Sequence, residues 1–288
     1  MLKKWMFAVV CGLLSITASA KGGFSLWQLA VQSDKIGNSY VMQTDKGKVI
    51  VMDGGYREEA PYLRGFIAAL GGKVDLWIVT HPHPDHIGAL IDILEHPNGI
   101  QVESILQSRF PEELYKLERS APHARKLYHL IDSLGIPETD LKETGLTMKI
   151  DGMNLKVLGV TNPEITTNVY NNSSMVVRVW DKHRSVLFLA DLGIEGGDKL
   201  LAHTPKKELD CDYLQMAHHG QAGVRKSFYQ AIRFRACLWP TPTWVYNNDI
   251  GKGFNTHILQ TIDTRNWMEE LGIEEQYVSC LLGTSKIF

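Results

Sequence analysis

The stretch VDLWIVTHPHPDH, residues 74–86, joins an apolar run to a dense group of polar side chains. Residues 74–80 predict a buried strand, because apolar side chains follow one another with little polar alternation. Four potential metal ligands come next, within six residues: His81, His83, Asp85 and His86. An extended backbone directs residues two apart to the same side, and zinc accepts imidazole nitrogen and carboxylate oxygen. The stretch therefore predicts a metal site between a strand and a helix; the alternative is an ordinary polar loop.

Strands and helices are intermixed on both sides of this stretch. The patterns predict strands at 39–44, 49–53, 102–107, 155–160, 175–180, 186–190, 213–217, 236–239 and 277–282. They predict helices at 60–70, 87–94, 112–134 with an interruption at Pro122, 226–234 and 255–271. Such intermixing, without a long linker or an internal repeat, predicts one layered α/β domain over residues 21–288.

The first twenty residues have the pattern of a secretory signal peptide. Lys3 and Lys4 precede an apolar run at 5–16, and the small residues Ala18 and Ala20 follow it. This order predicts cleavage after Ala20 and a periplasmic or secreted protein. A transmembrane anchor needs about 20 apolar residues, and this run is shorter.

Charge and cysteine content exclude some classes of protein. The chain has 30 Lys and Arg against 32 Asp and Glu, so its formal net charge is −2. That balance gives no strong signal for nucleic-acid binding, although bound metal ions can still attract a phosphorylated substrate. Cys211, Cys237 and Cys280 form no zinc-binding pattern. Buried free thiols are the favoured interpretation, with one Cys211–Cys237 disulfide as the alternative.

Four segments together resemble the metallo-β-lactamase superfamily. His81-x-His83-x-Asp85-His86, before a helix that contains Gly88, resembles the family's metal-binding signature. VIVMDGG at 49–55, LFLAD at 187–191 and MAHHG at 216–220 resemble three further conserved stretches of that family. The late His-His-Gly is typical of the branch that contains the hydrolase domain of a DNA-uptake channel protein and phosphorylcholine esterase. The resemblance covers nearly all of the chain after residue 20. It implies a four-layer αββα sandwich with its site on one edge.

The resemblance also implies a set of metal ligands. One ion would take His81 and His83, and the other would take Asp85 and His86. Asp191 would place one carboxylate oxygen on each ion, although an Asp at a strand end can also cap a helix. Zinc is the expected metal, with Mn²⁺ or Fe²⁺ as alternatives. Whether two ions bind or one stays open.

The remaining site residues come from the same resemblance. At least one of His218 and His219 completes the ligand set; His218, nearer the strand, is preferred, with His219 facing the substrate. Asp53 is expected to hydrogen-bond a ligand histidine, unless it only shapes a turn. His257 could contact a phosphate or protonate a leaving group, unless it only begins a helix. Residues 167–174 lack the further histidine of many family members, which leaves a weaker first site open.

The expected activity is hydrolysis by a metal-bound hydroxide, with Asp85, His219 and His257 as catalytic groups. No Gly-x-Ser-x-Gly elbow or Walker loop suggests another mechanism. A phosphoester, for example a phosphodiester, is the preferred substrate class. A carbonyl ester, lactone or β-lactam is the alternative within hydrolases. A non-catalytic binding domain stabilised by metal is the alternative from another class. The natural substrate and the oligomeric state stay open.

Overall fold

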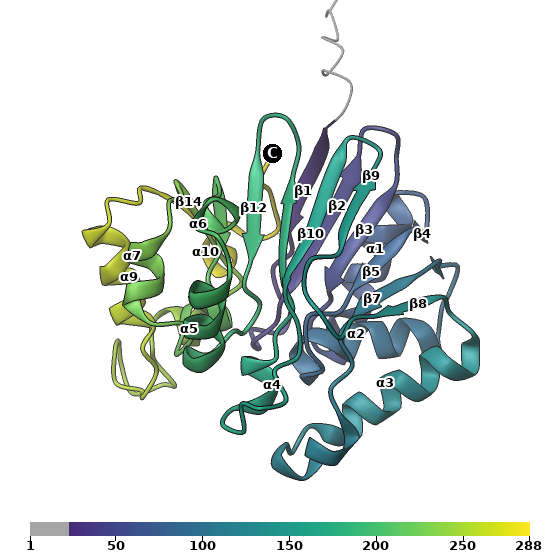
Figure 1. The fold of residues 1–288 in the computed structure, drawn as a ribbon, viewed down its shortest axis with the longest axis horizontal. Helices are drawn as coiled ribbons and strands as arrows, with labels where there is room; N and C mark the ends of the chain where they lie inside the picture. The colour runs from purple at the N-terminus through teal and green to yellow at the C-terminus, as the bar shows by residue number, and fades with distance from the viewer. Residues whose placement is uncertain (1–22) are drawn as a thin grey trace, which may run out of the picture.

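Two seven-stranded sheets pack face to face in the computed structural model, which describes residues 23–288 (Figure 1). Helices cover the outer face of each sheet. Three apolar clusters fill the spaces between these four layers, so the predicted four-layer αββα sandwich is confirmed. The signal peptide predicted at 1–20 lies outside the described residues.

The first sheet has the strand order β16-β1-β2-β3-β5-β7-β8. β1, β2 and β3 are antiparallel neighbours, whereas β3, β5, β7 and β8 run parallel. A separate pair, β4 and β6, is also parallel. The bounds are β1 (Phe24–Gln28), β2 (Ser39–Thr44), β3 (Val49–Asp53), β4 (Lys73–Val74), β5 (Leu76–Ile78), β6 (Gln101–Val102), β7 (Ile105–Gln107), β8 (Glu138–Asp140) and β16 (Ser285–Lys286).

The second sheet has the order β15-β14-β13-β12-β11-β10-β9. It mirrors the first, because β9 to β12 are antiparallel and β12 to β15 are parallel. The bounds are β9 (Thr147–Ile150), β10 (Met153–Gly159), β11 (Val176–Trp180), β12 (Ser185–Phe188), β13 (Tyr213–Gln215), β14 (Ala236–Trp239) and β15 (Glu275–Val278).

Each sheet has its own helical layer. The first is covered by α1 (Ala60–Ala69), α2 (Pro84–Glu95) and α3 (Ala121–Leu134), and the second by α5 (Ile194–His203), α7 (Lys226–Ala231) and α9 (Thr261–Glu270). The short helical elements are η1 (Arg57–Glu59), η2 (Glu112–Leu117), α4 (Val169–Asn172), α6 (Lys206–Leu209), η3 (Ala217–Gly220), α8 (Thr243–Tyr246) and α10 (Ser279–Leu282). Among residues 23–288, no helix is both long and apolar enough to cross a membrane.

Strand β3 shows why the layers form. Its side chains point alternately to the two faces of the sheet. Val49 and Val51 pack under the helices of the first layer, and Ile50 and Met52 pack between the two sheets. Because both faces are buried, the strand is apolar on both sides, which explains its uninterrupted apolar sequence.

Several predictions about elements were wrong in detail. The strands predicted at 74–80 and 102–107 are each divided in two, into β4 and β5 and into β6 and β7, and β4 pairs with β6 outside the two large sheets. The helix predicted at 112–134 is divided at 118–120, and Pro122 lies in the first turn of α3, where proline leaves no hydrogen bond unmade. The helix predicted at 255–271 starts only at Thr261. The strand predicted at 277–282 ends at Val278 and continues as α10.

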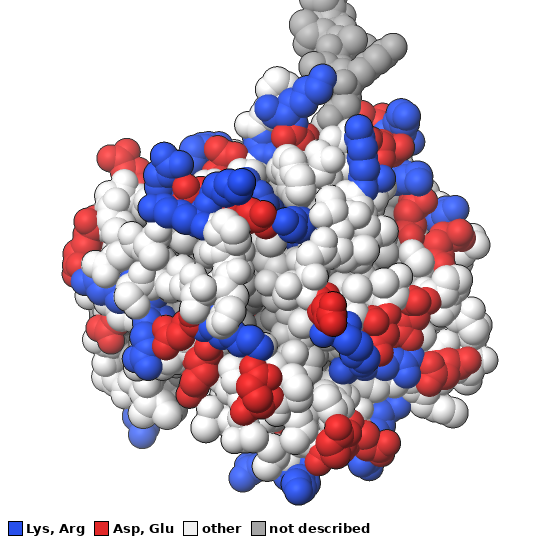
Figure 2. Space-filling view, viewed as in Figure 1, with Lys and Arg blue, Asp and Glu red and all other residues white. Residues whose placement is uncertain are grey.

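The three cysteines of the described chain are free thiols, so a Cys211–Cys237 disulfide is not formed. Cys237 is buried, as the favoured interpretation expected, and Cys211 and Cys280 are half-buried. Acidic and basic side chains are interspersed on the face seen in Figure 2, as the nearly balanced composition suggests.

Candidate metal centre

Strand ends from both sheets supply the candidate site. β5 leads into a loop that carries His81 and His83, and α2 begins at the next residue after this pair. Asp85 belongs to the first turn of α2. From the second sheet, Asp191 follows β12, and η3, which carries the late histidine pair, follows β13. Side chains far apart in the sequence therefore meet at one edge of the sandwich.

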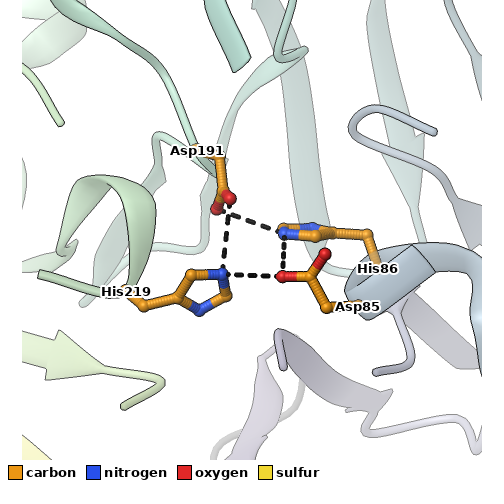
Figure 3. Close-up of side chains that lie close together, drawn as sticks. All are labelled: Asp85, His86, Asp191 and His219. Carbon is orange, nitrogen blue, oxygen red and sulfur yellow. Dashed lines mark hydrogen bonds and ion pairs between the residues drawn. The ribbon is translucent and has the colours of Figure 1, made fainter. Parts of the chain in front are cut away.

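Asp85, His86, Asp191 and His219 form the first of two clusters (Figure 3). One nitrogen or oxygen atom from each residue lies within 4.8 Å of the others. His86 Nε2 is 3.2 Å from Asp191 Oδ1, and His219 Nε2 is 3.1 Å from Asp85 Oδ2 and 3.3 Å from Asp191 Oδ2. Two imidazoles and two carboxylates that converge in this way offer four donors to one cation.

His81, His83 and Asp191 form the second cluster. His81 Nε2 lies 3.0 Å from His83 Nδ1 and 3.9 Å from Asp191 Oδ2. Asp191 thus belongs to both clusters, which is the position of a bridging carboxylate. This cluster has only three protein donors, because residues 167–174 bring no histidine.

Asp53, at the end of β3, hydrogen-bonds the ring of His86 on the side away from the cluster. Its Oδ2 accepts a hydrogen bond from the Nδ1 of His86 at 2.7 Å, which leaves Nε2 directed at the cluster. The same carboxylate accepts from the backbone and hydroxyl of Thr80 and from the side-chain amide of Asn38. A histidine fixed in this way presents its other nitrogen with the lone pair available to a metal.

The two late histidines differ in position. His219 is fully buried, and its Nδ1 donates to the carbonyl of Pro240 at 2.9 Å, so its Nε2 faces the cluster. His218 lies at the rim with a side chain 21% exposed, and its Nε2 is 3.8 Å from Asp191 Oδ2. The sequence analysis predicted His218 as the ligand and His219 as the residue that faces the substrate. In the structure His219, and not His218, belongs to the first cluster.

Unpaired atoms show that the site suits a cation. His86 Nε2 and Asp191 Oδ1 are buried and lack a hydrogen-bond partner, although they face each other. A buried polar atom without a partner is costly, and a metal ion between these two atoms would satisfy both. Imidazole and carboxylate are the donors that zinc accepts, and Mn²⁺ and Fe²⁺ accept them as well. The donor set therefore does not select one metal.

Without a cation, the carboxylates of the site favour the protonated form of two histidines. Burial lowers the pKa of His86, but Asp191, Asp53 and Asp85 more than offset this and leave that pKa well above its usual range. The same balance of burial against Asp191 and Asp85 raises the pKa of His219 to about 9. Cations would replace these protons, because a histidine ligand must be neutral.

The backbone at this edge is strained. Asp53, Ala190, His218 and His219 all have positive φ, at 55°, 49°, 52° and 58°. Non-glycine residues seldom adopt this conformation, and such strain often occurs at functional sites. These four residues belong to or adjoin the clusters, so the fold holds the strand ends in unusual conformations where the candidate ligands lie.

One candidate from the sequence is not brought to the clusters. The backbone of His257 bonds to Asn248, and its ring lies 6.2 Å from that of Trp244. No contact described for residues 23–288 joins His257 to a cluster residue. The segment that carries it is a loop, which corrects the interpretation of His257 as the start of a helix.

Two neighbours of the site were missed by the sequence. Glu118 Oε2 lies 3.4 Å from His83 Nε2, and the side-chain amide of Asn171 lies 3.3 Å from His218 Nε2. Asn171 falls in the Asn- and Ser-rich stretch 167–174, so its composition was a usable signal. Glu118 lies in a segment interpreted as helix, and nothing in its sequence pointed to His83.

A family model and several solved structures are similar to this chain in sequence or fold. The model of the metallo-β-lactamase superfamily matches residues 33–271. The metallo-β-lactamase fold protein YhfI from Bacillus subtilis has 12% identity and a TM-score of 0.55, over 92% of this chain and 99% of that chain. A mutant of CmlA β-hydroxylase has 13% identity and a TM-score of 0.51, over 90% of this chain and 53% of that chain. No curated protein matches. These likenesses show the fold, and the family match over most of the sequence shows that the chain belongs to the metallo-β-lactamase superfamily, with a His/Asp metal-binding cluster.

Proposed function

We propose that this protein is a metal-dependent hydrolase with a two-cation centre. One observation carries the proposal: two groups of His and Asp donors share Asp191, and two buried atoms that face each other in the first group, His86 Nε2 and Asp191 Oδ1, have no hydrogen-bond partner. A buried histidine and carboxylate that served only stability would pair with protein groups. The open donors are instead directed at a common space, as a cation requires.

The proposed ligands follow from the distances. Asp85, His86 and His219 would hold one cation, His81 and His83 would hold the other, and Asp191 would bridge them. His219 replaces His218 as the proposed ligand, because His219 Nε2 is nearer to both carboxylates. His218, at the rim, becomes the residue that faces the substrate.

Two cations held by these residues would supply a nucleophile from water near neutral pH and would offset negative charge that develops in the transition state. The residues of the chain do the rest. Asp53 fixes the ring of His86, and the carbonyl of Pro240 fixes that of His219. His218 donates its Nδ1–H to the carbonyl of Ala222, and its Nε2 accepts a hydrogen bond from the side-chain amide of Asn171. At the mouth of the site this Nε2 could take up a proton in place of that hydrogen bond.

A phosphoester is the proposed substrate, for example a phosphodiester or a phosphorylcholine-like ester. This rests on the resemblance of the late His-His-Gly motif to its branch and on the suitability of two cations for phosphoryl oxygens. Hydrolysis of a carbonyl ester, lactone or β-lactam is the alternative. We also propose that the protein is exported, from the signal pattern of residues 1–20. The N-terminal sequence of the protein recovered from its native host tests the export proposal, since a mature chain that still begins at Met1 contradicts it.

The activity is tested by elemental analysis together with rates on bis(p-nitrophenyl) phosphate and nitrocefin. Asp85→Ala should lose one cation, and its turnover should fall by at least about 10²–10³-fold, the range seen when one group that stabilises the transition state is removed. His129→Ala is the matched control, because His129 is an exposed histidine away from the clusters. Turnover of nitrocefin alone would end the phosphoester preference.

Two further results would overturn more of the proposal. Unchanged metal content in Asp85→Ala refutes the ligand assignment. A wild-type protein that binds two cations but hydrolyses nothing across a broad panel of phosphate, carboxylic and lactam esters favours a binding domain stabilised by metal.

A further inference from the structure

His83 differs from the other candidate ligand histidines in the nitrogen that it presents. Its Nδ1 lies 3.0 Å from His81 Nε2, inside the cluster, and its Nε2 therefore points outward. In His86 and His219 the arrangement is opposite, because each bonds a protein oxygen through Nδ1 and directs Nε2 inward. His83 thus needs its own acceptor at Nε2 if Nδ1 is to keep a free lone pair.

Glu118 is placed to be that acceptor. Its Oε2 lies 3.4 Å from His83 Nε2, with the two side chains 15% and 18% exposed. Its Oε1 accepts a hydrogen bond from the backbone N–H of Ser120 at 3.0 Å, just before α3. The hydrogen bond to Oε1 therefore fixes the carboxylate while Oε2 faces His83. Glu118 lies at the junction of η2 and α3, which is a different part of the fold from the strand ends that carry the ligands.

The ring of Tyr170 restricts His83 further. The two ring centroids lie 5.2 Å apart, and Tyr170 is fully buried against Phe110. The imidazole of His83 therefore has a packed aromatic neighbour and a carboxylate at its outer nitrogen. These contacts leave Nδ1 as the nitrogen directed at His81 and Asp191.

The cluster to which His83 belongs depends on this orientation more than the other cluster does. It has three protein donors, whereas the cluster around His86 has four. When few donors hold an ion, loss of one well-oriented donor removes a larger share of the affinity. Carboxylates that bond the outer nitrogen of a ligand histidine typically change metal affinity about 10- to 100-fold when removed.

We propose that Glu118 is a positioning residue for the metal centre: it accepts the Nε2–H of His83 and so reserves Nδ1 for the cation of the three-donor cluster. The inference rests on the proposed two-cation centre. It predicts that Glu118 controls the occupancy of one ion and not of both.

The test compares the wild type with Glu118→Gln and Glu118→Ala, and uses Glu113→Gln as a matched control. Glu113 is an exposed glutamate of η2, the short helix that ends one residue before Glu118. Each metal-free protein is titrated with Zn²⁺ against a chromophoric chelator, and Co²⁺ loading is followed by absorption spectroscopy. In Glu118→Ala we expect one of two ions to bind about 10- to 100-fold more weakly and the other to bind as in the wild type. Glu118→Gln retains an acceptor oxygen, so its loss should be smaller.

A double substitution separates positioning from a general effect on folding. If Glu118 acts through His83, then adding Glu118→Ala to His83→Ala should not weaken metal binding further. Thermal unfolding of each metal-free variant monitors the start of α3, where Glu118 also bonds Ser120.

The inference is overturned if Glu118→Ala binds both ions with wild-type affinity, or if both ions weaken equally along with the unfolding temperature. A wild-type protein that binds no cation at all would instead overturn the proposed function. The two failures are therefore distinguishable.

Discussion

Replacement of Asp53 by asparagine should reverse the proton arrangement on His86. Asp53 is fully buried, and its Oδ2 accepts from His86 Nδ1, from the hydroxyl of Thr80 and from the amide of Asn38, all at 2.7–2.8 Å. Asparagine keeps nearly the same shape but places an N–H₂ group where one of these acceptors was. With its oxygen on the Thr80 N–H, its amide nitrogen would donate to His86 Nδ1. The ring proton would then move to Nε2, the atom that faces the cluster.

The size of the effect follows from these contacts. Loss of a carboxylate partner of a ligand histidine weakens metal binding about 10- to 100-fold. Since tenfold in affinity corresponds to about 1.4 kcal/mol, the expected loss is about 1.4–2.8 kcal/mol. The amide of Asn38 also loses its acceptor, and a buried donor left without a partner costs about 1–3 kcal/mol in stability.

Zn²⁺ titration and denaturant unfolding of the metal-free protein measure these two quantities separately. Asn38→Ala is the control, because it removes a neighbour of Asp53 and leaves the carboxylate facing His86. We expect Asn38→Ala to lose stability but to bind both cations. Wild-type metal affinity in Asp53→Asn would refute the proposed role of the Asp53–His86 hydrogen bond.

Three other predictions follow from single features. Gly220→Ala should lower the free energy of unfolding by about 2–5 kcal/mol, because φ is +80° and a Cβ would lie 2.3 Å from the buried ring of Trp239. Gly47→Ala is the control: φ is +88° but the space around it is open, so the loss should be about 1–2 kcal/mol. Chemical denaturation measures both, and equal losses would contradict the clash. Because carboxylates raise the pKa of His219 to about 9 and that of His86 above its usual range, cation binding at pH 7 should release protons, and affinity should increase as pH rises toward 9. Calorimetry in buffers of different ionisation enthalpy detects the release, and a heat independent of buffer would argue against it. Burial raises the pKa of the Cys211 thiol to about 12 and that of Cys280 to about 11, so both should react slowly with a thiol reagent in the native protein and rapidly after unfolding, as peptide mapping would show.

Much of the fold was predictable because the apolar patterns of its strands are simple. β2, β3 and β14 have the predicted bounds, since strands buried on both faces give continuous apolar runs. β8, β9 and β16 were not predicted, because edge strands carry mixed sequences whose pairing depends on distant chain segments. β1, an interior strand that alternates buried and half-buried residues, was not predicted either. The start of α9 was misplaced because residues 255–260 contain no glycine or proline to mark the loop.

The candidate site was predictable where its residues lie close in sequence. The His81–His86 motif gave four of the residues directly, and family resemblance pointed to Asp191 and the late pair. The preference between His218 and His219 could not be decided, because both backbones adopt positive φ and the ordinary rule for side-chain direction after a strand does not hold there. Glu118 was out of reach because its approach to His83 depends on how α3 packs against α2.

The first cluster, which contains Asp85 and His219, also has a mechanical consequence. Asp85 and His219 are 134 residues apart in the chain and belong to opposite halves of the sandwich. A cation bound by both residues would close a very long loop of the chain and so cross-link the two halves. A ligand that binds only the native state stabilises it by mass action. Removal of the cation by a chelator should therefore destabilise the contacts between the two halves before it affects the structure within either half.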